Sequence, residues 1–283
     1  MRETFQYCEA LLRQADKDRF LAALFAPAEV RGALHALYAF SLETARVREA
    51  VTEPLAGEIR LQWWREAIAG ERAAEARGHP VASALLDVIG RYELPRARLA
   101  ELIEARRFDL GSEPMGSVTQ CEEYCRATSS ILVELAARVL DPDATPAEHR
   151  FADPAGISIA IAGLLRAFPL HAARGQLFIP GEVLARHDVD PQQIRMGRSG
   201  AGLAAALATM RGRAALHYQA ARTLIAHAPA AVMPAWLPVA LVPQYLRALG
   251  GNRNDPFRPA HVPQWQRQWT LWRAARSGRL GES

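Results

Sequence analysis

Lysine is nearly missing from this sequence, because Lys17 is the single lysine among 34 basic residues and arginine supplies the rest. The formal net charge is +4. Arginine enrichment also follows from a GC-rich genome, so the charge is a weak signal for nucleic-acid binding, and we expect no nucleic-acid partner. A mild positive balance suits an anionic membrane surface equally well.

Cysteine is also scarce, with three residues at Cys8, Cys121 and Cys125. An odd number without a C-x-x-C pair argues against a disulfide framework and for a reducing compartment. Cys121 and Cys125 lie one helical turn apart, but no nearby histidine or third cysteine completes a tetrahedral metal set. We expect all three to be reduced and structural.

Long apolar runs are missing as well. Residues 155–165 are too few to span a bilayer, and three prolines interrupt residues 230–243. The N-terminus carries charge throughout and lacks the apolar core of a secretory signal. We therefore expect a cytoplasmic protein, or one that is peripheral to the inner membrane.

Strand ladders, glycine-rich phosphate loops and internal repeats are not found, whereas helical periodicity recurs along the chain. The sequence predicts an all-α protein of roughly ten helices. We divide it into a domain over residues 1–250 and a basic, aromatic C-terminal extension over residues 251–283. The predicted helices cover residues 3–25, 27–51, 55–76, 80–92, 94–111, 117–140, 154–168, 200–228 and 229–249. Residues 154–168 are apolar all round, which indicates a central helix.

The extension contains a tryptophan stripe, with Trp265, Trp269 and Trp272 spaced four and three residues apart. This spacing places the three rings on one face of a helix. A terminal helix packed on its own domain explains the stripe, and so does a helix that contacts a membrane or a partner.

Five segments carry a resemblance to a known family: "LYAFSLETARVREAV", "IRLQWWREAI", "LIEARRFDL", "YCRATSS" and "GLLRAFPLHAARGQLFIP". They resemble squalene/phytoene synthases in order and spacing, over roughly residues 5–250. The resemblance implies an isoprenoid-synthase helical bundle around a central cavity. Active members join two prenyl diphosphates head to head, and two facing aspartate-rich helical motifs hold the Mg²⁺ that binds the diphosphate.

Both aspartate-rich motifs are degraded in this chain. The positions of the first, D-D-x-x-D, fall on Ala45, Arg46 and Glu49, and those of the second fall on Ala167 and His171. Mg²⁺ prefers hard oxygen ligands, which most of these residues cannot supply. Pro169 also disturbs a helix interior, at a cost of about 3 kcal/mol, so we expect the helix to kink or end there. We predict no catalytic residue, no metal and no cofactor.

The resemblance also points to residues of the cavity or of a ligand site. For Arg166 we favour an internal ion pair with Glu43 or Glu49, and for Arg174 phosphate binding and simple solvation stay open. His171 is either a ligand or base, or a hydrogen-bonded structural residue. The candidate cavity residues are Glu43, Arg46, Glu49, Tyr124, Ser129, Arg166, His171 and Arg174.

The "RAFPLH" variant, "LETARV" and "IRLQWWR" are similar to a branch of the family that includes a mitochondrial assembly factor for respiratory complex I. Our first hypothesis is a non-catalytic protein that helps to assemble this complex by contacting a subunit or an assembly intermediate, with a prenyl or lipid ligand in its cavity. One alternative is an active Mg²⁺-dependent prenyl transferase that uses Glu49 and His171. A second is a peripheral lipid-binding protein.

Overall fold

The computed structural model describes residues 2–145, 147–251 and 255–281, and over these residues it contains helices and no strand. The all-α prediction is therefore confirmed. The α-helices are α1 (Arg2–Ala15), α2 (Lys17–Ala23), α3 (Ala28–Ala45), α4 (Pro54–Ala69), α5 (Ala73–Gly78), α6 (Pro80–Tyr92), α7 (Arg96–Ala105), α8 (Val118–Cys125), α9 (Ile131–Leu140), α10 (Ala152–Arg166), α11 (Phe168–Ala173), α12 (Gly181–Arg186), α13 (Pro191–Arg195), α14 (Ala201–Ile225), α15 (Met233–Trp236), α16 (Val242–Gly250) and α17 (Gln264–Ser277). Short 3-10 segments are η1 (Val47–Ala50), η2 (Arg106–Leu110), η4 (Ala230–Val232) and η5 (Leu237–Leu241), and η3 (Arg126–Ser130) is a π-helical turn.

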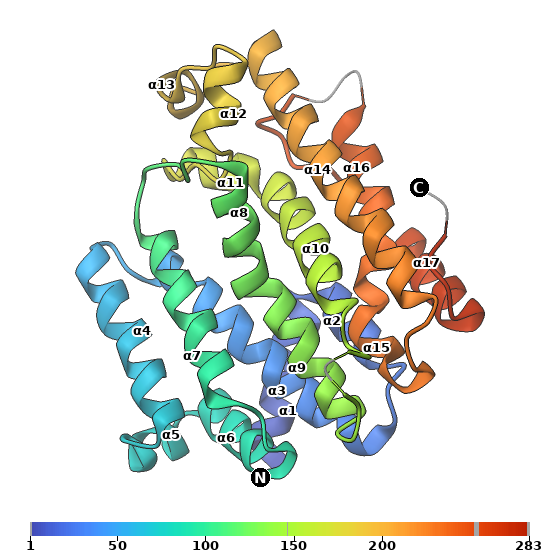
Figure 1. Ribbon diagram of the computed structural model, residues 1–283. Helices are drawn as coiled ribbons and strands as arrows, with labels where there is room; N and C mark the ends of the chain where they lie inside the picture. Colours follow the sequence, from blue (N-terminus) through green and yellow to red (C-terminus); the bar gives the residue numbers. More distant parts are fainter. Residues whose placement is uncertain (1, 146, 252–254, 282–283) are drawn as a thin grey trace.

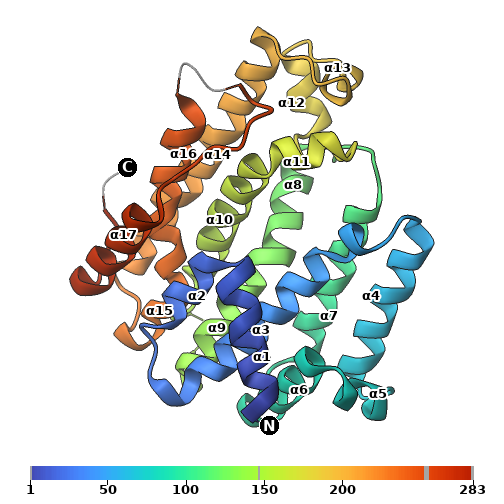
Figure 2. The same ribbon diagram turned by 180° about the vertical axis from the view of Figure 1, so that it is seen from behind.

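Helix α10 lies at the centre of the bundle, as its apolar sequence indicates (Figure 1). It packs most extensively against α14, where the Ser158 hydroxyl donates to the carbonyl of Ala214 at 2.9 Å. Helices α4, α5 and α7 form one side of the molecule, and α14, α16 and α17 form the other. The view from behind shows α1, α2 and α3 in front of the central helices (Figure 2).

Gly156 allows α10 to lie directly on the π-helical turn η3. A Cβ atom at this position would stand 2.2 Å from the Cα of Ser130, closer than any side chain tolerates. Only glycine lets the two backbones approach so closely. This contact fixes η3, and with it Thr128 and Ser129, beside α10.

Several predicted helices are interrupted for local chemical reasons. The segment 3–25 breaks at Asp16, whose side chain accepts the backbone N–H of Arg19 at 3.2 Å and so begins α2. The segment 55–76 breaks at Gly70, which adopts φ 96° after the last turn of α4. The predicted end before Pro169 is confirmed, because α10 stops at Arg166 and the proline lies in the first turn of α11. Sequence periodicity did not predict the short helices α11, α12 and α13.

Residues 255–281 pack onto the helical body. Leu271 and Ala274 of α17 are buried, and α17 contacts η5 and α2. The carbonyl of Gly281 accepts a hydrogen bond from the hydroxyl of Tyr218 at 2.8 Å. No helix in the described part of the chain combines the length and hydropathy that a bilayer crossing requires.

Candidate functional site

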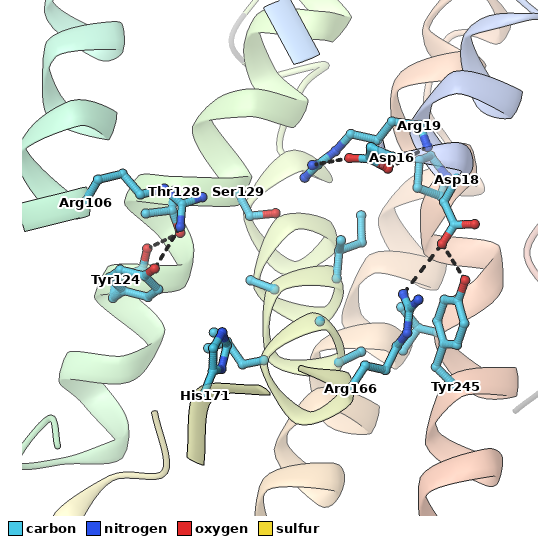
Figure 3. Close-up of a pocket in the computed structure, with 17 residues that line it drawn as sticks. Asp16, Asp18, Arg19, Arg106, Tyr124, Thr128, Ser129, Arg166, His171 and Tyr245 are labelled. Atoms are coloured by element: carbon cyan, nitrogen blue, oxygen red, sulfur yellow. Dashed lines mark hydrogen bonds and ion pairs between the residues drawn. The ribbon is translucent and has the colours of Figure 1, made fainter. Parts of the chain in front are cut away.

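A cavity of about 280 Å³ opens beside α10 (Figure 3). One wall comes from η2, α8 and η3, and the other from α2, the end of α10 and α16, while α11 closes one end. The apolar part of the lining includes Ile159, Leu164 and Val242. Polar side chains face it from both walls: Asp18, Arg106, Tyr124, Ser129, Arg166 and His171.

Asp18 is the charged centre of the α2 wall. One carboxylate oxygen lies 2.6 Å from the guanidinium of Arg267. The other oxygen lies 3.6 Å from the guanidinium of Arg166 and accepts a hydrogen bond from the hydroxyl of Tyr245. The Arg166 guanidinium also stacks on the Tyr245 ring, 3.7 Å from its centre. One carboxylate from α2 therefore joins α10, α16 and α17, and two arginines neutralise it.

The second cavity acid, Asp16, is also held by an arginine. Its carboxylate lies 2.9 Å from a guanidinium nitrogen of Arg19 while it caps α2. Both acids that line the cavity thus already have cationic partners within the protein.

The opposite wall is organised by Tyr124. Its hydroxyl donates to Asp109 at 2.6 Å and accepts from Arg106 at 2.8 Å, and Arg106 pairs with Asp109 at 3.2 Å. Burial raises the pKa of Asp109, although the positive charge of Arg106 opposes this shift. Burial also raises the pKa of Tyr124 well above its ordinary value, so the phenol keeps its proton.

Three buried polar atoms around the cavity have no hydrogen-bond partner among the described residues. They are the hydroxyl of Ser129, Nδ1 of His171 and Nε of Arg106. An unpaired buried polar group costs about 1–3 kcal/mol, so these atoms favour a polar group inside the cavity. Burial, with a smaller contribution from Arg174, lowers the pKa of His171 to about 4, so the imidazole is neutral at pH 7.

The positions of the aspartate-rich motifs lie where helices end. Ala45 is the last residue of α3, Arg46 follows it as the cap, and Glu49 lies in η1. Ala167 caps α10, and His171 belongs to the next helix. Neither set can therefore present oxygen ligands from one regular helix face.

The residues present do not fit the Mg²⁺ cluster that the resemblance implies. Ala45 and Ala167 carry no donor, Arg46 is a cation, and the carboxylate of Glu49 lies 2.7 Å from Arg174. No group of three histidine, cysteine, aspartate or glutamate side chains comes together as metal ligands anywhere in the described ranges.

The structure divides the predicted cavity residues into two groups. Tyr124, Ser129, Arg166 and His171 line the cavity. The other four do not line it: Glu43, Arg46, Glu49 and Arg174. The expected internal ion pair of Arg166 is confirmed, but the suggested partners are wrong, because the carboxylate is that of Asp18 and not of Glu43 or Glu49.

Glu43 instead faces His79. The Nδ1 atom of His79 accepts the backbone N–H of Ala82 at 3.3 Å, which leaves the ring proton on Nε2, 3.4 Å from the carboxylate of Glu43. Burial raises the pKa of Glu43 to about 7 and lowers that of His79. This pair lies in the bundle away from the cavity lining.

The sequence interpretation missed Asp16, Asp18, Tyr245 and the inward role of Arg267. A local signal existed for α2, because "ADKD" places two acids at a helix start where Asp16 can act as a cap. No signal identified the partners of Asp18, which lie far away in the sequence.

Known proteins are similar to this chain in sequence and in fold. Residues 12–273 match the family profile described as squalene/phytoene synthase. The chain is 30% identical to the rat (Rattus norvegicus) protein named NADH dehydrogenase (ubiquinone) complex I, assembly factor 6, over 90% of this chain and 76% of that protein. It is 25% identical to the 15-cis-phytoene synthase of Synechococcus elongatus, over 95% of this chain and 91% of that enzyme. The crystal structure of a dehydrosqualene synthase in complex with ligand superposes with a TM-score of 0.80 at 18% identity, covering 98% of this chain and 96% of that one.

Replacement of Asp18 by asparagine (D18N) should lower the free energy of unfolding by about 3 kcal/mol, because it leaves Arg267 and Arg166 half-buried without a counter-charge. The control is D153N, which removes an exposed pair with Arg126 and should cost at most about 1 kcal/mol. Urea unfolding at neutral pH measures both. Equal losses for the two variants would contradict the central role of Asp18.

Replacement of Glu43 by glutamine (E43Q) should stabilise the protein at high pH. The fold raises the pKa of Glu43 from the ordinary 4.5 to about 7, so the wild type loses stability as the pH rises between these values. The Tm of E43Q should exceed that of the wild type at pH 8 and approach it near pH 4.5. The control is E53Q, which makes the same substitution at an exposed carboxyl. A constant difference across this range would contradict the buried carboxyl.

Proposed function

The chain belongs to the squalene/phytoene synthase family, and from that premise we propose that it acts in the assembly of respiratory complex I and not as a prenyl transferase. The likeness to the rat assembly factor supports this role, because it extends over 90% of this chain. Its partner is then a subunit or an assembly intermediate of that complex.

One observation carries the non-catalytic part of the proposal. Both acids of the cavity wall are bound by arginines, with Asp18 between Arg166 and Arg267 and Asp16 beside Arg19. A carboxylate that already holds guanidinium groups is a poor ligand for a divalent cation, because the cation must displace them and leave them buried without a partner. The cavity lining therefore offers no carboxylate that is free of a cationic partner.

The size of the cavity favours the same conclusion. Its volume of about 280 Å³ lies just below the roughly 300–1,000 Å³ typical of sites for one drug-sized ligand. A head-to-head condensation needs room for two prenyl chains at once. The cavity suits at most one short chain.

We propose that the cavity retains a single prenyl or lipid-like molecule. The apolar lining of Ile159, Leu164 and Val242 suits a hydrocarbon. The unpaired atoms of Ser129 and His171 suit a polar end group that donates or accepts hydrogen bonds. No cofactor is part of this proposal.

The enzymatic alternative is tested by incubating the purified chain with farnesyl or geranylgeranyl diphosphate and Mg²⁺. We expect no release of pyrophosphate, whereas a phytoene synthase in the same assay serves as the positive control.

The A45D/A167D double variant should also remain inactive, because both positions lie at helix ends and Asp18 stays paired with its arginines. Product formation by the double variant would contradict this argument from the helix ends, and product formation by the wild-type chain would contradict the non-catalytic role.

The assembly role is tested by deleting the gene in its own organism. The amount of assembled complex I on native gels and the NADH oxidation of isolated membranes should both fall, and the wild-type gene should restore them. Succinate oxidation by the same membranes is the control for a general respiratory defect. Normal complex I after deletion would contradict the proposal and favour a peripheral lipid-binding protein.

A further inference from the structure

We propose that α17 docks the protein onto an anionic lipid bilayer through the tryptophan face formed by Trp265, Trp269 and Trp272. This inference does not depend on the proposed role in complex I assembly. The occupant of the face is a membrane surface, and the helix lies on the bilayer without crossing it.

The tryptophan face is the exposed side of a helix whose other side is firmly packed. Leu271 and Ala274 point inward, while Trp265, Trp269 and Trp272 are 66%, 54% and 44% exposed. The rings of Trp269 and Trp272 stack, with centres 4.9 Å apart. The three indoles form a shallow groove together with Gln268. Single exposed apolar side chains are ordinary, but a contiguous cluster on one face is typical of a contact surface.

The charge around this face complements an anionic surface. Arg273, Arg276 and Arg279 are exposed, and residues 256–281 contain no aspartate or glutamate. The Arg276 guanidinium lies over the Trp272 ring, 5.7 Å from its centre, so cation and indole share one side of the helix. None of these three arginines has an ion-pair partner within the described residues.

This combination favours a membrane over a protein partner. Indoles settle at the boundary between headgroups and hydrocarbon, and arginines beside them attract anionic lipid. The single inward arginine, Arg267, is neutralised by Asp18 at 2.6 Å, so all remaining positive charge of the helix faces outward. A second copy of this chain would bring two such cationic faces together, and like charges repel.

Docking in this way would place α17 between the membrane and the cavity wall. Arg267 of α17 binds Asp18, and Asp18 also binds Arg166 in the cavity lining. The bilayer would therefore be separated from the cavity by α17 itself and by this charged cluster.

The experiment is sedimentation of the full chain with two kinds of vesicle, phosphatidylcholine alone and equal parts of phosphatidylcholine and phosphatidylglycerol. We expect strong binding to the anionic vesicles only, weakened by added salt. The W265S/W269S/W272S variant should bind about tenfold or more weakly. The R273Q/R276Q variant should lose about fivefold for each arginine removed.

The matched control is L55S/I59S, which removes two equally exposed apolar side chains from α4, 71% and 64% exposed, on another part of the molecule. It should bind vesicles as the wild type does. Thermal melts check that every variant folds, and quenching of wild-type fluorescence by brominated lipids tests the contact without any substitution.

Three outcomes would overturn the proposal. The first is a wild type that sediments with neither vesicle. The second is a folded tryptophan variant that binds as well as the wild type. The third is self-association in solution that the tryptophan substitutions abolish while vesicle binding stays absent, which would assign the face to a second copy of the chain.

Discussion

The carboxylate of Asp18 is the constraint on which the rest of the site depends. It joins α2 to α10, α16 and α17 through Arg166, Tyr245 and Arg267. Charges at the edge of a low-dielectric cavity need partners, and two guanidinium groups around one carboxylate supply them within the fold. The same arrangement decides the chemistry of the cavity, because the acid that could bind a metal is already used to hold four helices together.

Both helices that carry the motif positions end at or just before them. α3 ends at Ala45, where the Thr44 hydroxyl bonds back to the carbonyls of Phe40 and Ser41, and α10 ends at Arg166 before the turn that contains Pro169. The lost ligands and the helix end thus coincide at each motif. The bundle itself does not require either motif, since its helices pack through apolar faces. The family fold can therefore persist at a TM-score of 0.80 without them.

The sequence predicted most of the helices and the helix end before Pro169. It did not predict which acidic and basic side chains form ion pairs. Pro54, Pro80 and Pro169 mark helix starts, because proline suits a first turn, so these boundaries are local properties. The pairing of Asp18 with Arg267 joins residues 249 positions apart, and nothing local distinguishes it from a pairing of Arg166 with Glu43. The same limit applies to Glu49 and Arg174, which only tertiary packing brings together.

Helix α17 illustrates how one amphipathic segment can serve two environments. Arg267, Leu271 and Ala274 recur at the four- and three-residue spacing of one face, and this face is packed on the body. Trp265, Trp269 and Trp272 recur with the same spacing on the opposite face and stay exposed. An arginine on the inner face needs an acid, and Asp18 supplies it. The helix that carries the proposed membrane face is thereby bonded to Asp18, so two ion pairs, Arg267 with Asp18 and Asp18 with Arg166, connect it to the cavity lining.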